Sequence, residues 1–327
     1  MEPPKIAPCP VRGLALLGET IVLARFIANA EGLESNLFAS AVGKSGTLAG
    51  PYCHGDVLGR PYGSRVPSRE SVGPLSHKPA YALRLTPELW TLSLPHRTQI
   101  LFAADIAMVV SRLALRPGSV VVESGTGSGS LTHSLARAVT PGGMVHTFEF
   151  NASRAAQAKE EILAHGLSSV VRVAHRDVVA GGFLLQGAGQ ETLGVTPRGA
   201  TAAFLDLPNP WEAVAHARAS LAPGGVLCSF SPCIEQVQRA CAAMAAEGFE
   251  DIRTFETLLR PWEFEDLGPA PPDCGSGGSG SPSTSGSGGA SPPPFAALPS
   301  LSTSVSLQPQ ARARGHTGYL TFAHLYK

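Results

Sequence analysis

The chain has 327 residues, of which 43% are hydrophobic, and its 25 basic side chains balance 25 acidic ones. This length and apolar content are those of an ordinary globular protein with one large domain or two of unequal size, which excludes a wholly disordered chain. The formal net charge of zero excludes a protein that holds nucleic acid through an overall positive charge, so any RNA binding must use local patches or a partner.

The six cysteines show no C-x-x-C spacing and no histidine placed as a zinc partner. They predict reduced thiols in an intracellular protein that needs no metal. No apolar run approaches the roughly 20 residues that a membrane span requires, so we expect no membrane segment. The N-terminal sequence MEPPKIAPCP lacks the Arg-rich, acid-poor character of a mitochondrial transit peptide, which favours the nucleus or the cytosol.

In chain order, residues 1–80 consist of short apolar runs separated by Gly, Pro and Ser, and they predict a small, mainly β domain. Residues 85–115 have apolar side chains at helical spacing. From Ser119 onward, apolar runs alternate with amphipathic helices, and Ser153 is a candidate N-cap for one of these helices. This alternation predicts a parallel sheet covered on both faces, which is a doubly wound α/β fold.

Two segments interrupt the alternation. Residues 182–200 predict a loop insertion, and residues 269–314, which include CGSGGSGSPSTSGSGGASPPP, predict a disordered low-complexity insertion. Strand character returns in GYLTFAHLY, and a surface insertion before a last strand is tolerated because lengthening a loop adds little closure entropy. The main domain is therefore expected to comprise residues 81–268 and 315–327.

The most specific motif is VVVESGTGSGS at 120–130, a strand that ends at Glu123 and is followed by a glycine-rich turn and a helix. Glycines allow the backbone to approach a ligand closely and the helix to begin tightly against the sheet. A dinucleotide fingerprint would need glycine at position 130, which is Ser130. The E-x-G-x-G-x-G spacing favours S-adenosylmethionine instead. The three glycines are Gly125, Gly127 and Gly129.

Acidic residues end the next two strands. Glu149 follows MVHTF about twenty residues past the loop, where a carboxylate can accept both ribose hydroxyl protons. Asp177 ends VVRVAHRD, where it can accept the exocyclic amine of an adenine ring. The alternative is that each acid only caps the following helix, but the joint spacing of three strand ends favours a cofactor site.

Asp206 ends the fourth strand, in AAFLDLPNPW, at the edge where ligands bind in open α/β sheets. It either caps the following helix or directs an acceptor toward the methyl group, and the rigid Pro-containing loop favours the second. Ser231 and Pro232 end the fifth strand, where an acceptor pocket and a plain turn are equally compatible with the sequence. His96 and Arg97 precede an apolar helix, and spacing alone favours a solvated cap.

Several segments together resemble one family, the catalytic subunit of the tRNA (adenine-58-N1)-methyltransferase. They are ELWTLSLPHRTQI, ESGTGSGS, FLDLPNPWEAV, FSPCIEQVQ, GHTGYLTF and GRPYGSRV, and the resemblance runs from about Pro87 to Phe322. It implies a seven-stranded Rossmann-like methyltransferase sheet and methyl transfer from S-adenosylmethionine to N1 of adenine 58 in the tRNA T-loop. The first residues, the 182–200 insertion and the length of the low-complexity tract depart from the family.

The motif and the resemblance together give two sets of site residues. The cofactor-binding set is Leu101, Glu123, Gly125, Gly127, Ser128, Gly129, Ser130, Glu149, Arg154, Arg176, Asp177 and Asp206. The tRNA-binding set is His96, Arg97, Asn209, Ser231, Pro232, His316 and Thr317. Adenine N1 has a free lone pair, so no proton need be removed, and our hypothesis is that Asp206 accepts a hydrogen bond from the N6 amine and stabilises the developing cation.

The resemblance also implies a nuclear protein, with the cytoplasm as a second location, and a heterotetramer of two catalytic and two non-catalytic tRNA-binding subunits. Three other functions are compatible with parts of the sequence. A non-catalytic tRNA-binding subunit would not need an intact glycine loop, Glu149 and Asp206. A nicotinamide oxidoreductase is disfavoured by Ser130 and by the lack of an evident Tyr-x-x-x-Lys pair. A methyltransferase with another acceptor is disfavoured only by the resemblance.

Overall fold

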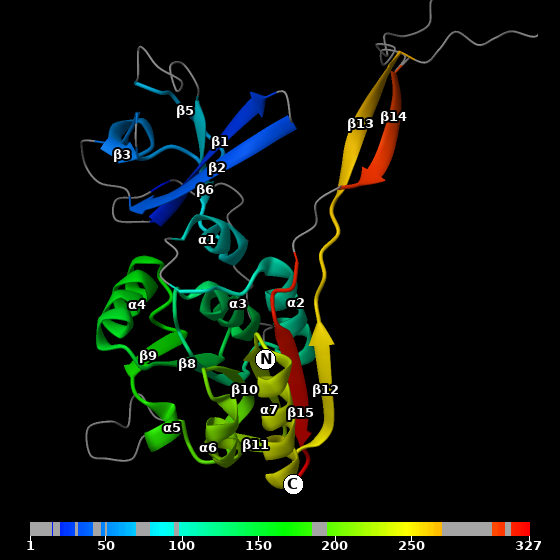
Figure 1. Cartoon of the computed structure of the whole chain (residues 1–327). Coiled ribbons are helices and arrows are strands. Elements are labelled where there is room, and N and C mark those ends of the chain that lie inside the picture. Colours follow the sequence, from blue (N-terminus) through cyan, green and yellow to red (C-terminus); the bar gives the residue numbers. More distant parts are fainter. Residues whose placement is uncertain are drawn as a thin grey trace, which may run out of the picture. The chain divides into compact units, whose positions relative to one another are not determined.

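The structure is a computed structural model, and it describes residues 15, 20–29, 32–41, 47–49, 51–69, 79–94, 98–184, 195–269, 303–310 and 315–327. The chain divides into two compact units, Met1–Thr257 with His316–Lys327, and Leu258–Gly315. All the elements that position the candidate site belong to the first unit (Figure 1).

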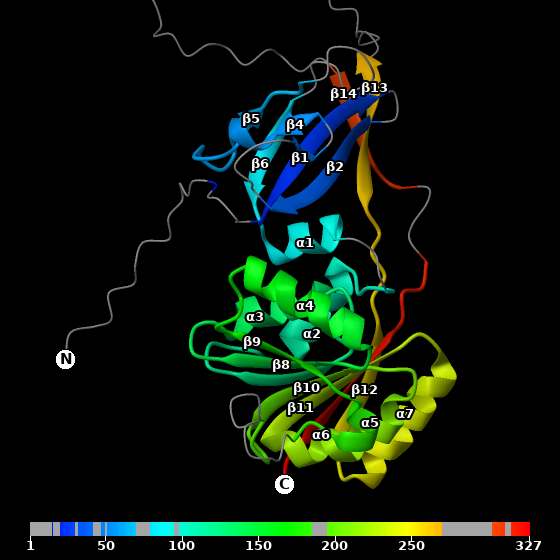
Figure 2. The ribbon, with the colours of Figure 1, turned by 90° about the vertical axis from the view of Figure 1, so that its left-hand side faces the viewer.

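An antiparallel sheet forms the N-terminal part of the first unit. Its strands lie in the order β2-β1-β6-β5, and a separate pair of short strands lies between β2 and β5 in the sequence (Figure 2). Buried apolar side chains of these strands, among them Leu23, Tyr52 and Ala82, form their own core. The predicted mainly β character of this region is confirmed. The elements are β1 Thr20–Asn29, β2 Gly32–Ala41, β3 Thr47–Ala49, β4 Tyr52–Cys53, η1 His54–Asp56, β5 Arg65–Val66 and β6 Ala80–Arg84.

A seven-stranded sheet forms the main part of this unit, in the order β12-β15-β11-β10-β7-β8-β9. The five strands from β11 to β9 are parallel, and β15 runs antiparallel to both β11 and β12. The predicted doubly wound methyltransferase sheet is therefore confirmed, and GYLTFAHLY supplies β15. The strands are β7 Val120–Ser124, β8 Met144–Glu149, β9 Val171–His175, β10 Ala200–Asp206, β11 Leu221–Ser231, β12 Glu250–Glu256 and β15 Tyr319–Leu325.

Helices cover both faces of this sheet (Figures 1 and 2). Apolar side chains of α2, α3 and α4 pack on one face, and those of α5, α6 and α7 pack on the other. Neighbouring residues of β10 point to opposite cores, Phe204 to the first and Leu205 to the second, which is why the strand is apolar throughout. The helices are α1 Pro87–Ser93, α2 Ala103–Arg112, α3 Ser130–Val139, α4 Ala152–Ala164, α5 Val178–Gly181, η2 Pro210–Ala213, α6 Val214–Ser220 and α7 Ile234–Ala246.

The start of α4 differs from the prediction. Asn151, not Ser153, is the N-cap, and its side chain accepts a hydrogen bond from the Arg154 amide at 3.0 Å. Asparagine caps as well as serine does, and it follows β8 almost directly, so the helix begins two residues earlier than predicted. This places Arg154 in the first turn, within reach of the end of β8.

The second unit contains an antiparallel hairpin of β13 (Trp262–Pro269) and β14 (Thr303–Pro309). The prediction of disorder covered 269–314, and β14 lies within that range. The rest of the range lies outside the described residues, apart from Pro269 at the end of β13 and Gln310, which both belong to this unit. Residues 185–194 of the predicted 182–200 insertion lie outside the described residues as well. Among the helices of the described ranges, none is both long and apolar enough to cross a membrane.

Candidate active site

The glycine loop lies where the strand order reverses. It follows β7, which is flanked by β8 on one side and β10 on the other, and it leads into α3. Ligands bind at such switch points because the connections leave in opposite directions and open a crevice. Gly125 has φ of 92°, and a Cβ there would collide with the backbone carbonyl oxygen of Asp206. Glycine is therefore required for the loop to pass against the end of β10.

A cavity of about 580 Å³ opens above this loop. That volume is within the range of about 300–1,000 Å³ typical of small-molecule sites. Every member of the predicted cofactor set except Gly129 lines it. Of the predicted tRNA set, Asn209 lines it, whereas Ser231, Pro232, His316 and Thr317 do not. His96 and Arg97 lie outside the described residues.

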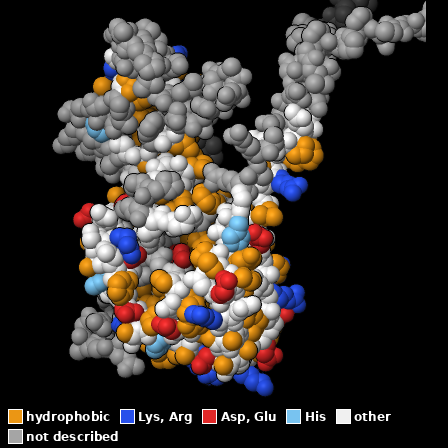
Figure 3. Space-filling view, in the orientation of Figure 1, with side chains coloured by type: hydrophobic (Ala, Val, Ile, Leu, Met, Phe, Trp, Pro, Cys, Tyr) orange, Lys and Arg blue, Asp and Glu red, His pale blue; other side chains and the backbone are white. Residues whose placement is uncertain are grey.

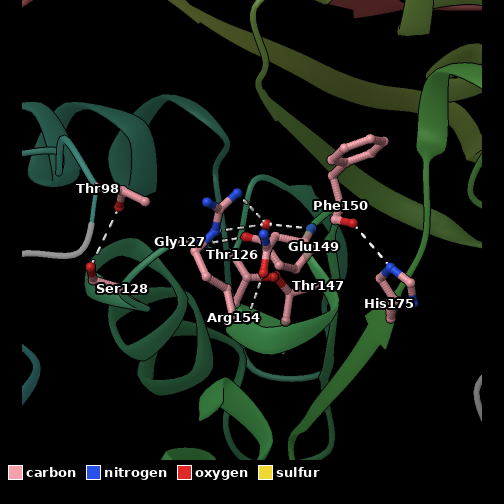
Figure 4. A network of polar contacts seen from close by, with 10 residues as sticks. Thr98, Thr126, Gly127, Ser128, Thr147, Glu149, Phe150, Arg154 and His175 are labelled. Carbon is pink, nitrogen blue, oxygen red and sulfur yellow. Dashed lines mark hydrogen bonds and ion pairs between the residues drawn. The ribbon is translucent and has the colours of Figure 1, made fainter. Parts of the chain in front are cut away.

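Glu149, at the end of β8, has hydrogen-bond donors on both carboxylate oxygens (Figure 4). Oε2 accepts from the Gly127 amide at 3.0 Å. Oε1 accepts from the Asn151 amide at 2.9 Å and from Arg154 Nε and Nη2 at 3.0 and 2.7 Å. Burial alone would raise the pKa of this carboxyl group, but the hydrogen bonds from Arg154 and the two amides lower it below its ordinary value. Glu149 is therefore a fixed negative charge that also holds the glycine loop.

Glu123 lies beneath the loop and is 1% exposed. Its Oε2 accepts a hydrogen bond from Thr132 Oγ1 of α3 at 2.7 Å. Burial, together with the nearby Asp206 carboxylate, raises the pKa of Glu123 to about 7. This side chain therefore ties the end of β7 to the first turn of α3 and adds acidic character to the floor of the cavity.

Asp206, at the end of β10, has different surroundings. Among the described residues, none donates a hydrogen bond to its carboxylate. Burial and the charge of Glu149 raise the pKa of Asp206 to about 7. The backbone beyond it is held at Pro208, whose carbonyl accepts a hydrogen bond from Gln236 Nε2 of α7 at 3.0 Å. The carboxylate thus faces the cavity with its acceptor capacity free.

Asp177 and Arg176 line the end of the cavity near β9. The carboxylate of Asp177 caps α5, accepting hydrogen bonds from the amides of Val179 and Ala180 at 2.9 and 3.3 Å. The capping alternative of the sequence analysis is therefore what the structure contains, although Asp177 also lines the cavity. Arg176 donates to the carbonyls of Gly181 and Leu184. Phe150 is 68% exposed, and its carbonyl lies 3.0 Å from His175 Nε2 (Figure 4).

The residues predicted to bind tRNA beyond the cavity are gathered around β15. His316 Nδ1 lies 2.5 Å from Glu256, and its Nε2 lies 3.1 Å from the Pro232 carbonyl oxygen. The Glu256 contact raises the pKa of His316. Thr317 Oγ1 donates to buried Asp105 at 3.2 Å. The structure therefore joins Pro232, His316 and Thr317 in one network outside the cavity, with the Ser231 hydroxyl buried beside Pro232.

Sequence analysis missed residues that hold the loop from the side of α1. Thr98 Oγ1 lies 3.4 Å from Ser128 Oγ (Figure 4), and Thr91 Oγ1 lies 2.8 Å from Ser130 Oγ. Both belong to ELWTLSLPHRTQI, one of the segments that carry the family resemblance, but no pattern in the sequence distinguishes these hydroxyl groups. Trp90, also in that segment, donates from Nε1 to the Ser128 carbonyl at 3.2 Å.

The lining suits a ligand that carries positive charge. Glu123, Glu149 and Asp206 converge on one cavity, and burial together with repulsion among these carboxylates raises the pKa values of Glu123 and Asp206 to about 7, so the site opposes further negative charge. A sulfonium would relieve this repulsion, whereas a dinucleotide pyrophosphate would increase it. The residues therefore fit S-adenosylmethionine. Within the described residues, no three His, Cys, Asp or Glu side chains are grouped to hold a metal ion.

Comparison with known proteins places the sequence among tRNA methyltransferases. Residues 78–274 match the model of a family described as the tRNA methyltransferase complex GCD14 subunit. The Dictyostelium discoideum tRNA (adenine(58)-N(1))-methyltransferase catalytic subunit is 41% identical over 281 residues, which cover 84% of this chain and 86% of that protein. The corresponding subunit of Cryptococcus neoformans is 47% identical over 218 residues, which cover 65% of this chain and 46% of that protein.

Two solved structures share the fold over nearly the whole chain. An S-adenosylmethionine-dependent O-methyltransferase from Thermotoga maritima superposes with a TM-score of 0.67 at 22% identity, covering 95% of this chain and 94% of that one. The tRNA (m1A58) methyltransferase TrmI from Aquifex aeolicus gives a TM-score of 0.62 at 20% identity, covering 96% of this chain and 100% of that one. Identities this low establish the fold alone.

Proposed function

This chain belongs to the family of tRNA (adenine(58)-N(1))-methyltransferase catalytic subunits, and we propose that it transfers a methyl group from S-adenosylmethionine to N1 of adenine 58 in the tRNA T-loop. The observation that carries the proposal is the pairing of two carboxylates in one cavity. Glu149 has donors on both oxygens and is fixed, whereas Asp206 faces the same cavity with its acceptor capacity free.

The cofactor, when bound, supplies a methyl group already activated by the sulfonium charge. The residues proposed to hold it are those of the glycine loop and the ends of β8 and β9. Glu149 would accept hydrogen bonds from ribose hydroxyls, and its fixed orientation through Arg154 and Gly127 supports this role. Exposed Phe150, next to it on the chain, offers an apolar face to the adenine ring.

Asp206 is the residue proposed to orient the acceptor. Adenine N1 is neutral and has a lone pair, so the site needs no general base. The carboxylate of Asp206 would accept a hydrogen bond from the N6 amine and thereby align N1, and its charge would stabilise the cationic base as methylation proceeds. The rigid segment after it, with Pro208 held by Gln236, supports a fixed position for this carboxylate.

The target base must leave the folded T-loop to enter the cavity, and unstacking a base costs a few kcal/mol. We propose that a non-catalytic partner subunit provides much of the tRNA contact that offsets this. The net charge of zero supports such a division of labour, as does the interspersed arrangement of Lys, Arg, Asp and Glu on the face drawn in Figure 3. The proposed assembly has two catalytic and two non-catalytic subunits and resides in the nucleus, with the cytoplasm as a second location.

The test is methyl transfer from labelled S-adenosylmethionine to unmodified tRNA, with and without the partner subunit, followed by mapping of the modified base. We expect label at N1 of adenine 58, with the partner required. A matched tRNA with guanosine at position 58 should receive none. Label at another base, or on another acceptor, would contradict the proposed specificity. Cofactor binding without any transfer would instead favour the alternative of a non-catalytic subunit.

A further inference from the structure

Three aromatic rings pack together behind the glycine loop. Trp90 comes from α1, His133 from α3, and His165 from the C-terminal end of α4. The ring centroids are 5.3 Å apart for Trp90 and His133, 4.6 Å for Trp90 and His165, and 5.0 Å for the two histidines. None of the three lines the cavity, although the loop between them and the cavity does. The cluster therefore supports the loop from the side opposite the ligand.

Two of these rings bond consecutive peptide groups of the loop. Trp90 Nε1 donates to the Ser128 carbonyl at 3.2 Å, and His133 Nδ1 lies 2.6 Å from the Gly129 carbonyl oxygen. A carbonyl oxygen can only accept, so His133 Nδ1 must carry the proton. Both carbonyl groups are thus held by side chains that lie outside the cavity.

The second histidine fixes the first. His133 Nε2 lies 2.8 Å from His165 Nδ1. Burial lowers the pKa of each histidine to about 4, so both are neutral near pH 7. A neutral His133 that is protonated on Nδ1 can only accept at Nε2, and His165 must therefore donate from Nδ1. The Gly129 carbonyl in this way determines the tautomer of both rings.

The local backbone bonds of Gly129 are its amide to the Thr126 carbonyl at 2.9 Å and the His133 amide to its own carbonyl at 3.2 Å, so the His133 side chain adds a second donor to that carbonyl. Gly129 precedes α3 in the left-handed region, with φ of 73°, and it has no side chain that could cap the helix. The next residue, Ser130, lines the cavity and begins α3, whose first amides have no partner inside the helix. A small rotation of the Gly129 peptide would therefore move the groups that face the ligand.

We propose that His133 is a positioning residue for the cofactor: its hydrogen bond to the Gly129 carbonyl fixes the loop and the first turn of α3, and His165 holds its ring in place. The identity of the ligand rests on the proposed function. The inference itself concerns binding of that ligand and not the methylated base, so the two are tested by different measurements.

Two substitutions separate the hydrogen bond from the packing. In His133→Asn, the side-chain amide can place an N–H near the former Nδ1 and keep the Gly129 bond, but it loses most of the ring contacts. In His133→Phe, the ring contacts with Trp90 remain and the side-chain bond to the Gly129 carbonyl is lost, while the backbone amide of residue 133 still donates to it. Both variants lose the bond from His165. A positioning role therefore predicts that Asn preserves cofactor binding better than Phe, and a packing role predicts the reverse.

The experiment is calorimetric titration of the full chain with S-adenosylmethionine. We expect His133→Phe to raise the dissociation constant about tenfold, which is the typical effect of losing one buried hydrogen bond. His133→Asn should recover most of the lost affinity. His324→Phe is the control, because His324 lies on β15 with its ring stacked on Tyr326, away from the loop. Wild-type affinity in His133→Phe, or weaker binding by Asn than by Phe, would overturn the inference.

A second readout keeps the test decisive if a variant fails to fold. Nitrogen-15 NMR of the wild-type chain should report the proton of His133 on Nδ1, and a proton on Nε2 instead would overturn the inference. Failure of the wild-type chain to bind S-adenosylmethionine would contradict the proposed function, whereas normal wild-type binding with the Phe variant unaffected would contradict only the role of His133.

Discussion

The strands on either side of β7 both end in a carboxylate at the cavity, yet the two carboxylates have opposite surroundings. Glu149, at the end of β8, accepts hydrogen bonds from Gly127, Asn151 and Arg154, which lower its pKa. Asp206, at the end of β10, receives none from the described residues, and burial with the charge of Glu149 raises its pKa to about 7. One side of the cavity is complete before any ligand binds. The other side has an acceptor without a donor.

Under the proposed function, the difference lets a single cavity bind two ligands in different ways. A carboxylate with its donors in place is preorganised and serves to bind, because its geometry does not change when a ribose arrives. A desolvated carboxylate without a donor is destabilised until a ligand supplies one, so its interaction strengthens as positive charge develops nearby. We therefore assign cofactor binding to the side of Glu149 and the methyl-transfer step to the side of Asp206.

The largest expected effect comes from Asp206→Ala. Removal of the acceptor should lower the single-turnover methylation rate about 10²–10³-fold, which is typical for loss of one electrostatic contact to a transition state. Cofactor affinity should change far less. Rapid-quench transfer of labelled methyl groups measures the rate, and Asp251→Asn, an exposed acid on β12, is the control. An unchanged rate would remove the distinction between the two sides.

Glu149→Gln should show the opposite pattern. The substitution removes a charge bonded to Arg154 and weakens the link to Gly127, so S-adenosylmethionine should bind about 10–100-fold more weakly. The single-turnover rate at saturating cofactor should fall much less than in Asp206→Ala. Titration calorimetry and single-turnover kinetics on the same preparation give both numbers, and a loss confined to the rate would reverse our assignment.

The pH dependence should follow Asp206. Its ionised form accepts the hydrogen bond, and because its pKa is raised to about 7, kcat/KM for the cofactor should increase with pH and level off above it. From the titration of one group, the plateau should exceed the value at pH 6 by about tenfold. The rise of kcat/KM with pH should be absent from the residual activity of Asp206→Asn. A wild-type profile that is flat between pH 6 and 8 would contradict control by the ionisation of Asp206.

The smallest effect concerns stability. The pKa of Asp206 is raised in the folded state, so the folded chain favours the protonated carboxyl group. The resulting stabilisation of the folded state is fully present below the unfolded-state pKa of about 3.9 and is lost as pH rises through 7. Neutral Asp206→Asn should therefore melt above wild type at pH 8, by about 2–4 °C for each kcal/mol that the buried carboxylate costs, and equal to it near pH 4. Scanning calorimetry at both values provides the comparison, and a variant that melts lower at pH 8 would contradict a destabilised carboxylate.

The sequence was sufficient to predict the sheet and the acids at its strand ends because these are local features. Glu149 and Asp206 each directly follow an apolar strand, and parallel strands carry such residues to one edge. The sequence did not indicate which of the two carboxylates would have its hydrogen-bond donors in place, because Arg154 reaches Glu149 only if α4 begins at the observed residue. The cap at Asn151 in place of Ser153 decides that start, and both residues are compatible with the local pattern.

The support behind the loop was beyond sequence reasoning for a different reason. His133 and His165 are 32 positions apart and belong to different helices, so only the tertiary packing of α3 against α4 brings them together. The β13–β14 hairpin was also missed, since the Gly, Ser and Pro of the intervening segment dominated the composition of the region.

The most direct test of the account is a double-mutant cycle between Asp206 and the N6 amine of the target base. Single-turnover methylation is measured for wild type and Asp206→Ala, each with tRNA that has adenosine or purine riboside, which lacks the amine, at position 58. If the carboxylate acts through that amine, either change alone should slow the reaction, and the second change should add little to the first. If the two rate reductions multiply, Asp206 does not bind the amine, and the assigned role is contradicted.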